Sequence, residues 1–286
     1  MVNNFMARHS IREHLALVLI WAVPCIITGI FLWIIGDILC HGLRQISWQF
    51  LFSEPLDGGR KGGIFSILVS TFWILVICMR FALPLGISTA ILLAEYNDQN
   101  SIFGRLVRWS LDILAGVPSI VFGLFGNAIF VKALGLGFSI LAGGLTLACM
   151  VLPLLIRATA EGLRAVPQSY RLGAASLGIS QTKTLWYLVL PAAMPGFVVG
   201  FVLGIGRAIA ETAALIFTSG YVDRLPSSLL DSGRSLSIHI YDLAMNIPGG
   251  NANAYGTATV LILLLLLING LTSWLGHYWT KYNLKF

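Results

Sequence analysis

The stretch IFSILVSTFWILVICMRFALPLGISTAILLA, residues 64–94, decides the fold class of this chain. It is apolar along almost its whole length, and Arg80 is its only charged residue. Crossing about 30 Å of hydrocarbon takes roughly 20 apolar residues, so the stretch is long enough to span a bilayer with tilt or overhang. Because backbone groups in lipid must bond within their own segment, we expect a transmembrane helix.

Five more stretches have the same character. The six expected spans are Leu15–Ile38, Ile64–Ala94, Ser110–Val131, Phe138–Ile156, Leu188–Phe217 and Thr257–Tyr278. They are continuous apolar runs, whereas a membrane β-barrel needs alternating strands of about ten residues. Only 10% of the residues are charged, against about a quarter in soluble proteins, and the mean hydropathy is +0.85. The sequence therefore predicts an all-α, polytopic integral membrane bundle of six helices.

The first span is longer than the core of a signal peptide, and no small-x-small cleavage site follows it. We therefore expect an uncleaved anchor. Residues 1–63 form an N-terminal anchor helix with an outside segment, and residues 64–280 form the core, with a cytoplasmic loop at 157–187.

Lysine and arginine indicate the orientation, because cytoplasmic segments carry more of them. With an inside N-terminus, the inside segments hold ten and the outside segments six of the 18 Lys and Arg residues. Both termini should then face the cytoplasm, and the chain should be a multi-pass protein of the cytoplasmic (inner) membrane. The net charge of +6 suits the anionic headgroups of the bilayer's inner face and gives no reason to expect nucleic acid.

Two outside segments carry patterns of their own. Residues 58–63, GGRKGG, could form an anion nest, although a flexible turn is favoured. No Lys-Ser/Thr pair follows as in a P-loop, so the chain shows no nucleotide site. Further on, Leu236, Ile240, Leu243 and Ile247 recur at helical spacing and predict a short helix at the outer surface, with His239 solvated or interfacial.

The inside segment from Arg157 to Tyr187 carries a helix–glycine–helix pattern. A first helix should begin near Pro167, a residue preferred at the first helical position, and Gly178 should end it in a left-handed cap. A second short helix follows over Ser180–Tyr187. The apolar stripe expected on the first helix consists of Val166, Tyr170, Ala174 and Leu177. Periodicity alone leaves two alternatives open, a projecting elbow or an ordinary amphipathic loop.

The elbow, YRLGAASLGISQTKTLWYLVLP from Tyr170 to Pro191, resembles the EAA loop of binding-protein-dependent ABC importer permeases. In that family the loop forms a coupling helix that docks on the ATPase subunit. Gly178 and Leu190-Pro191 match the motif, but Leu172 stands where glutamate is usual and Gly173 where the first alanine is. The resemblance implies that the ATPase-coupling residues are Tyr170, Leu172, Gly173, Ala174, Leu177 and Gly178.

Three more motifs narrow the resemblance to permeases of phosphate importers: LAEY at 93–96, PSIVFGLF at 118–125 and GRAIAETAALIFT at 206–218. This implies a type I ABC importer permease fold. It also implies a complex with a second permease subunit, two copies of an ATPase and a periplasmic phosphate-binding protein. ATP would be used by the partner ATPase, and the chain itself would hold no cofactor and catalyse no reaction.

Three charged residues lie well inside the expected spans, away from their ends. Arg207 lies 16 residues past Pro191, or roughly 24 Å along a helix, and Glu211 follows four residues later on the same face. Intramembrane charges are costly and functional by default, and the planar guanidinium fork suits phosphate. A purely structural pair is the alternative, although the family resemblance also implies a role in translocation. Arg80 becomes a pathway candidate on the charge argument alone, whereas Glu95 and Asp112, near inner span ends, should be solvated or snorkelling.

Two other functions remain open at this point. The cargo could be another oxyanion, such as phosphonate, phosphite, sulfate or molybdate, since an intramembrane arginine does not distinguish between them. An intramembrane enzyme is the remote alternative, but the sequence has no G-x-S-x-G, H-E-x-x-H or paired histidines. Cys25, Cys40, Cys78 and Cys149 are scattered singly, which favours packing over a disulfide framework or a metal site.

Overall fold

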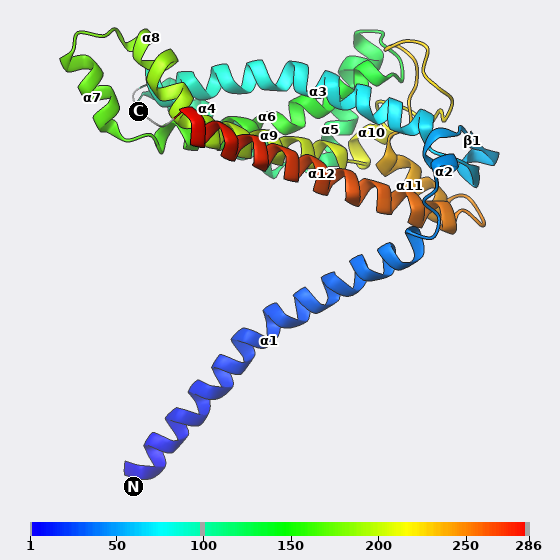
Figure 1. Ribbon diagram of the computed structural model, residues 1–286, viewed down its shortest axis with the longest axis horizontal. Helices are drawn as coiled ribbons and strands as arrows, with labels where there is room; N and C mark the ends of the chain where they lie inside the picture. The colour runs from blue at the N-terminus through cyan, green and yellow to red at the C-terminus, as the bar shows by residue number, and fades with distance from the viewer. Residues whose placement is uncertain (1, 98–100, 284–286) are drawn as a thin grey trace.

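A computed structural model describes the backbone of residues 2–97 and 101–283, and it is largely helical. Three long helices form the centre of the bundle: α3 (Phe65–Ile91), α6 (Ile140–Arg164) and α9 (Leu190–Ile209) (Figure 1). Within the described residues, five helices are long and apolar enough to cross a membrane, or six if one sharply bent pair is a single span. The all-α membrane fold is therefore confirmed.

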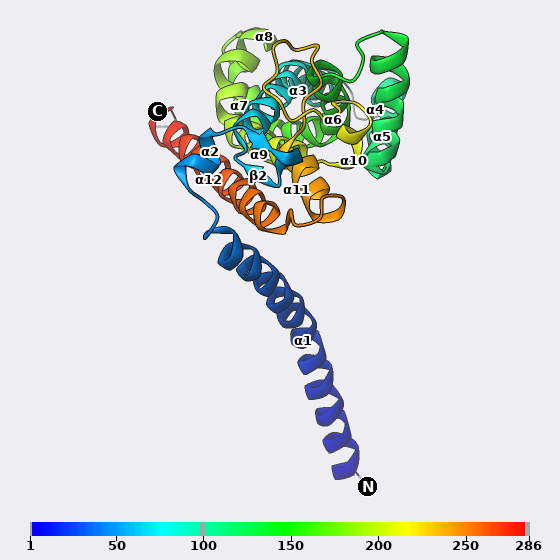
Figure 2. The same ribbon diagram turned by 90° about the vertical axis from the view of Figure 1, so that its right-hand side faces the viewer.

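Helix α1 (Val2–Gly42) leaves the bundle as a separate rod, as both views show (Figures 1 and 2). In its apolar part, Leu17–Gly42, no residue of the most hydrophobic 18-residue stretch is buried. Near its C-terminal end it meets α12 (Asn251–Asn283), where the Tyr255 hydroxyl donates a hydrogen bond to the Asp37 carboxylate over 3.1 Å. Over residues 17–42, most of the apolar surface of α1 is thus left uncovered by the described part of this chain.

The two ends of the bundle differ. One end, here called the elbow end, holds η2 (Leu92–Tyr96), α7 (Gln168–Ser176), α8 (Gln181–Thr184) and η4 (Leu185–Val189). The opposite hairpin end holds α2 (Trp48–Phe52), strands β1 (Pro55–Leu56) and β2 (Lys61–Gly62), and α11 (Leu236–Met245). Figure 1 shows them at the left and right of the bundle.

The glycine-rich run forms a tight antiparallel hairpin. Its turn, η1 (Asp57–Gly59), contains positive φ angles at Asp57, Gly58 and Gly59, which glycine adopts without steric cost. The Asp57 carboxylate lies 3.5 Å from Arg60 and 3.4 Å from Lys61, so an internal carboxylate already pairs with both cations. This arrangement speaks against an anion nest.

The third expected span, Ser110–Val131, is not continuous. It consists of α4 (Ile102–Gly116), α5 (Ser119–Gly126) and η3 (Asn127–Ala133), with a bend of 102°. Val117 and Pro118 at the bend have extended ψ angles of 129° and 142°. Proline disfavours helical geometry in the residue before it, which explains why the helix stops there.

The fifth expected span is also interrupted. Helix α9 ends at Ile209, and after a short break a new helix, α10 (Ala213–Ile216), begins. The apolar helix that could span the membrane runs over Gln181–Ile209 instead of Leu188–Phe217. Hydropathy could not show this break, because the residues on both sides of it are apolar.

Helix α6 packs against α3 through small residues. A methyl group on Gly86 of α3 would lie 3.3 Å from the Leu155 side chain, and one on Gly144 of α6 would press against Ile77. Glycine lets membrane helices approach closely, so both positions are packing sites. The residue numbers of the contacting positions increase together on both helices, which shows that α3 and α6 run in the same direction.

Helix α9 runs the opposite way along α6. A methyl group on Gly162 of α6 would lie 2.6 Å from the Cα of Gly196, and one on Gly204 would lie 3.0 Å from the Val151 side chain. The residue numbers of the contacting positions therefore increase along α9 as they decrease along α6, so the two helices are antiparallel. Because α6 contacts both α3 and α9, the α6 residue that a position faces gives its depth in the bundle on either neighbour.

Candidate functional site

Arg207 lies in the last turn of α9, and Glu211 lies in the break between α9 and α10. The expected ion pair is present, with 3.7 Å between the Arg207 Nη2 and the Glu211 Oε2. The Glu211 Oε1 accepts the Ala214 N–H over 3.2 Å and so caps the first turn of α10. The Glu211 carbonyl also accepts the Ser237 hydroxyl over 2.6 Å. Glu211 is therefore held by hydrogen bonds from α10 and α11 in addition to its pairing with Arg207 of α9.

The two partners differ in exposure. The Glu211 side chain is 5% exposed, whereas the Arg207 side chain is 53% exposed on the surface of this chain. Arg207 follows three residues after Gly204, which packs on Val151 near the middle of α6. The geometry thus presents a guanidinium at mid-bundle depth, with a fixed carboxylate behind it.

Arg80 lies at a similar depth on α3. It falls between Ile77, which packs on Gly144 of α6, and Gly86, which packs on Leu155. The residue is exposed, and in the part of the chain that the structure describes it has no hydrogen-bond or ion-pair partner. Arg80 thus lies near the middle of helix α3, and its depth in the membrane and its role in the pathway stay predictions.

The elbow has the expected helix–glycine–helix form. Helix α7 starts directly after Pro167, and Gly178 adopts a left-handed φ of 69°. The Ile179 N–H donates to the Ala174 carbonyl over 3.0 Å, and the Gly178 N–H donates to the Ala175 carbonyl over 3.0 Å. These bonds satisfy carbonyls at the helix end in the manner of a glycine cap.

The expected apolar stripe of α7 is only half correct. Val166 and Ala174 are buried, but Tyr170 and Leu177 are exposed, and so are Leu172 and Gly173. Leu172 and Leu177 are 62% and 80% exposed. The six residues assigned to coupling therefore do not share one face, and Leu172 and Leu177 are exposed apolar side chains among exposed polar neighbours.

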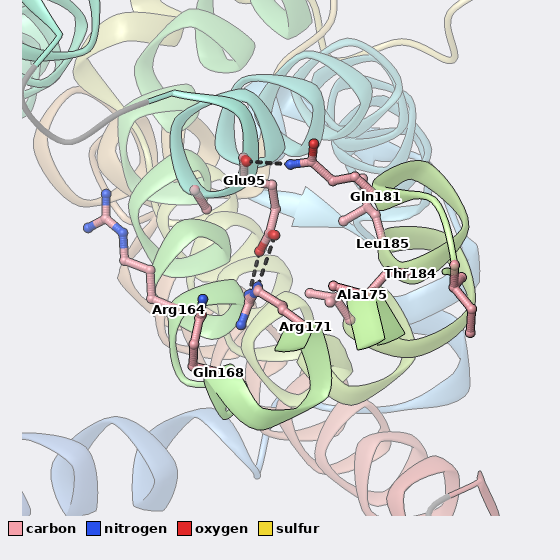
Figure 3. Close-up of a pocket in the computed structure, with 11 residues that line it drawn as sticks. Glu95, Arg164, Gln168, Arg171, Ala175, Gln181, Thr184 and Leu185 are labelled. Carbon is pink, nitrogen blue, oxygen red and sulfur yellow. Dashed lines mark hydrogen bonds and ion pairs between the residues drawn. The ribbon is translucent and has the colours of Figure 1, made fainter. Parts of the chain in front are cut away.

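A buried ion pair that the sequence did not predict anchors the elbow (Figure 3). The Arg171 Nε donates to the Glu95 Oε2 over 3.0 Å, and its Nη2 donates to the Oε1 of the same carboxylate. The guanidinium also donates to the carbonyls of Val166 and Leu163 over 2.9 and 3.0 Å. Glu95 is 7% exposed, so the expectation of a solvated or snorkelling carboxylate was wrong.

This pair ties three elements together at one end of the bundle. Glu95 belongs to η2 at the end of α3, Arg171 belongs to α7, and Gln181 of α8 donates to the Glu95 carbonyl over 3.0 Å (Figure 3). The hydrogen bond to Glu95 raises the pKa of Arg171, which keeps the guanidinium charged. Beside the pair lies a cavity of about 560 Å³, whose lining also includes Arg164 and Gln168. Residues 76 positions apart meet here, and spacing along the sequence could not show it.

At the hairpin end, a second polar cluster is buried. Arg234 lies 3.3 Å from Asp242, and its Nε donates to the Tyr221 carbonyl over 2.9 Å. His239 is fully buried under Gly59, so the expectation of a solvated or interfacial histidine was wrong. Burial and the nearby Arg234 lower the pKa of His239 to about 3, and Asp242 opposes the shift. The ring is therefore neutral and serves packing at this end.

With this geometry in place, comparison with known proteins assigns the chain to a family. The profile of the family described as "Binding-protein-dependent transport system inner membrane component" matches residues 82–280. The chain belongs to this family. Its members are ABC transporter permeases, so the chain is a multi-pass membrane transport subunit, and the matched region contains both the Arg207 break and the elbow.

Relatives extend this family match over nearly the whole chain. A probable ABC transporter permease protein, YqgI of Bacillus subtilis, is 31% identical, covering 93% of this chain and 96% of the relative. The phosphate transport system permease proteins PstA of Mycobacterium leprae and Haemophilus influenzae are 31% and 30% identical. They cover 92% and 90% of this chain, and 88% and 92% of the two relatives.

Solved structures confirm the type I importer permease fold. A chain of the inward-facing MetNI methionine ABC transporter aligns with a TM-score of 0.58 at 18% identity, covering 76% of this chain and 94% of that one. A chain of a bacterial ABC transporter that imports alginate aligns with a TM-score of 0.59 at 12% identity, covering 88% and 95%. The TM-scores support the fold, whereas identities this low leave the cargo open.

Proposed function

We propose that this chain is a permease subunit of an ATP-driven importer that carries inorganic phosphate across the cytoplasmic membrane. The observation that carries the proposal is the near full-length similarity to proteins named as phosphate permeases, at 30–31% identity. These matches include the stretch with Arg207 and Glu211, whose geometry suits an oxyanion.

The chemistry of Arg207 supports this cargo. A charged side chain at bilayer depth costs roughly 2.5–3.5 kcal/mol on insertion scales, so an exposed guanidinium there needs water, a partner subunit or an anion. Arginine offers two parallel N–H donors that fit a phosphate. Because Glu211 is held by Ala214 and Ser237, it can orient the guanidinium without following it.

The assembly follows from which surfaces this chain leaves open. The exposed apolar face of the elbow around Leu172 and Leu177 is the proposed docking surface for the ATPase subunit, which would bind and hydrolyse ATP. A second permease subunit would cover Arg80, Arg207 and the bare surface of α1. A periplasmic phosphate-binding protein would dock at the hairpin end. Residues 64–280 would form the permease core and residues 1–63 an anchor, with both termini and the elbow in the cytoplasm.

The usual glutamate of the EAA motif is absent, and Arg171 beside it offers a different means of holding the elbow. Its bidentate bond to Glu95 ties the proposed ATPase-docking helix to the end of α3, which carries Arg80. Movement of the docked elbow would then reach the pathway through η2 and α3. The docking surface itself would bind by apolar contact.

The test is uptake of labelled phosphate into membrane vesicles that hold this chain with its neighbouring subunits. We expect uptake that needs ATP and loaded binding protein, and that excess unlabelled phosphate suppresses. Uptake of labelled sulfate, molybdate, phosphonate or phosphite by the same vesicles, without uptake of labelled phosphate, would replace phosphate by that oxyanion. An importer complex that carries none of these ions would refute the proposal.

A further inference from the structure

A groove runs along α6 beside the bent third span. Its first part has a volume of about 450 Å³ and an almost wholly apolar lining. Helices α4 and α5 contribute one wall, including Leu114, Val121 and Phe125, and α6 contributes the other from Cys149 to Ile156. This part exists because the bend at Val117–Pro118 carries α5 away from the direction of α4.

The groove continues toward the elbow end and becomes basic. Its second part, of about 250 Å³, shares Leu111 and Ile156 with the first and is also lined by Arg108, Arg157 and Arg164. Two carboxylates, Asp112 and Glu161, lie in the same lining. Three cations against two anions leave one net positive charge at this end.

The basic side chains keep hydrogen-bonding capacity. Arg157 donates to Asp112, and the two side chains are 44% and 65% exposed. Arg164 lies 3.5 Å from Glu161, with exposures of 37% and 75%. A guanidinium has five N–H donors, so each of these pairs leaves donors open for another anion.

The length of the groove matches one leaflet of a bilayer. From Cys149 to Arg164 along α6 is 15 residues, or about 22 Å at 1.5 Å per residue. Half of a bilayer with its headgroups is about 20–22 Å thick. The apolar part lies at mid-bundle depth and the basic part at the elbow end, which is the order of an acyl chain and its phosphate headgroup.

We propose that this groove binds one anionic phospholipid. Its headgroup would lie at the basic end, near Arg108, Arg157 and Arg164, and an acyl chain would lie at the apolar end, near Val121 and Phe125. Basic pockets between membrane helices on the cytoplasmic side are suited to anionic headgroups. A helix of a partner protein would bury the apolar part, but it would have to bring its own anion to the level of Arg157. A phospholipid already combines both features at the required spacing. The inference concerns lipid rather than cargo, so it stands apart from the proposed phosphate transport.

The experiment uses the assembled complex in vesicles with a phosphatidylglycerol probe that carries a photoactivatable diazirine on its acyl chain. Crosslinks should concentrate on peptides containing Val121, Phe125 and Leu152. The matching phosphatidylcholine probe should label them several-fold less, because it lacks the net negative charge. Arg157→Gln should weaken phosphatidylglycerol labelling about fivefold, the change that corresponds to about 1 kcal/mol for one basic residue.

Arg105→Gln is the matched control for Arg157→Gln, since Arg105 is an exposed arginine of α4 that does not line the groove. It should leave groove labelling unchanged. Val121→Trp should abolish labelling of the apolar part by filling it. Equal labelling by both probes, or equal effects of Arg157→Gln and Arg105→Gln, would overturn the proposal. So would protection of a cysteine at Val121 by the second permease subunit, which would show that a protein helix occupies the groove.

Discussion

Replacing Arg171 by glutamine should release the elbow from the bundle without unfolding the spans. The substitution keeps a polar side chain of moderate length but removes the charge and the guanidinium fork. Glu95 would then remain at 7% exposure without its cation, and the carbonyls of Val166 and Leu163 would lose their donor. The helices themselves pack elsewhere, for example at Gly162 and Gly196.

The magnitude follows from the burial of the pair. Removing one partner of a buried ion pair costs about 3–5 kcal/mol. Arg171 is 20% exposed, so we expect the lower end, about 3 kcal/mol. Since 1.4 kcal/mol corresponds to a factor of ten, local opening of α7 should become roughly 100-fold more frequent.

Amide hydrogen exchange over Gln168–Ser176 measures this opening directly. Exchange there should rise by about two orders of magnitude, while exchange in the α6 amides around Val151 stays the same. In the assembled complex, ATP hydrolysis should lose its response to loaded binding protein. The double substitution with Glu95→Gln should recover part of the protection, because two neutral amides can bond to each other.

Arg164→Gln is the control, because the Arg164 and Glu161 side chains both reach solvent and such pairs contribute at most about 1 kcal/mol. Exchange of α7 should change less than fivefold in that variant. If Arg171→Gln leaves α7 exchange within about threefold of the native rate, the pair does not anchor the elbow and the reasoning is refuted.

Four more predictions concern single sites. Arg207→Gln should lower phosphate uptake by about tenfold or more, and adding Glu211→Gln should not restore it; restored uptake at equal complex abundance would make the pair purely structural. Gly178→Val should strain the left-handed cap by about 1–2 kcal/mol and weaken ATPase coupling while the spans still insert; full coupling would exclude the cap from this role. Cysteines introduced at Gly178 and Ser232 should react with an impermeant reagent from opposite sides of the membrane, and labelling from one side would break the topology. The pKa of His239 is lowered to about 3 from 6.5, so the hairpin end should lose roughly 2 kcal/mol of stability as the pH falls from 7 to 5, and His239→Gln should remove this slope in pH-dependent unfolding.

Composition and hydropathy were enough to predict that this chain lies in a membrane and that its spanning segments are helical. Apolar runs such as residues 64–94 can only satisfy their backbone groups as helices in lipid, so composition and run length were sufficient. The elbow could also be predicted, because Pro167 and Gly178 start and end α7 through local backbone geometry. The Arg207–Glu211 pair was predictable because four residues separate its members along one segment.

The positions of the helix breaks and the pairing of distant charges could not be predicted from the sequence, because both depend on how the helices pack. Pro118 and the Glu211 cap divide two runs that hydropathy counts as continuous. Glu95 and His239 seemed solvated from their neighbours in sequence, yet both are buried by segments far away along the chain. Hydrophobic periodicity reports the environment of one segment averaged over its turns, whereas an ion pair such as Glu95–Arg171 depends on the packing of η2 against α7. That packing arises from the fit of α3, α6 and α9 at their glycines, which no single segment encodes.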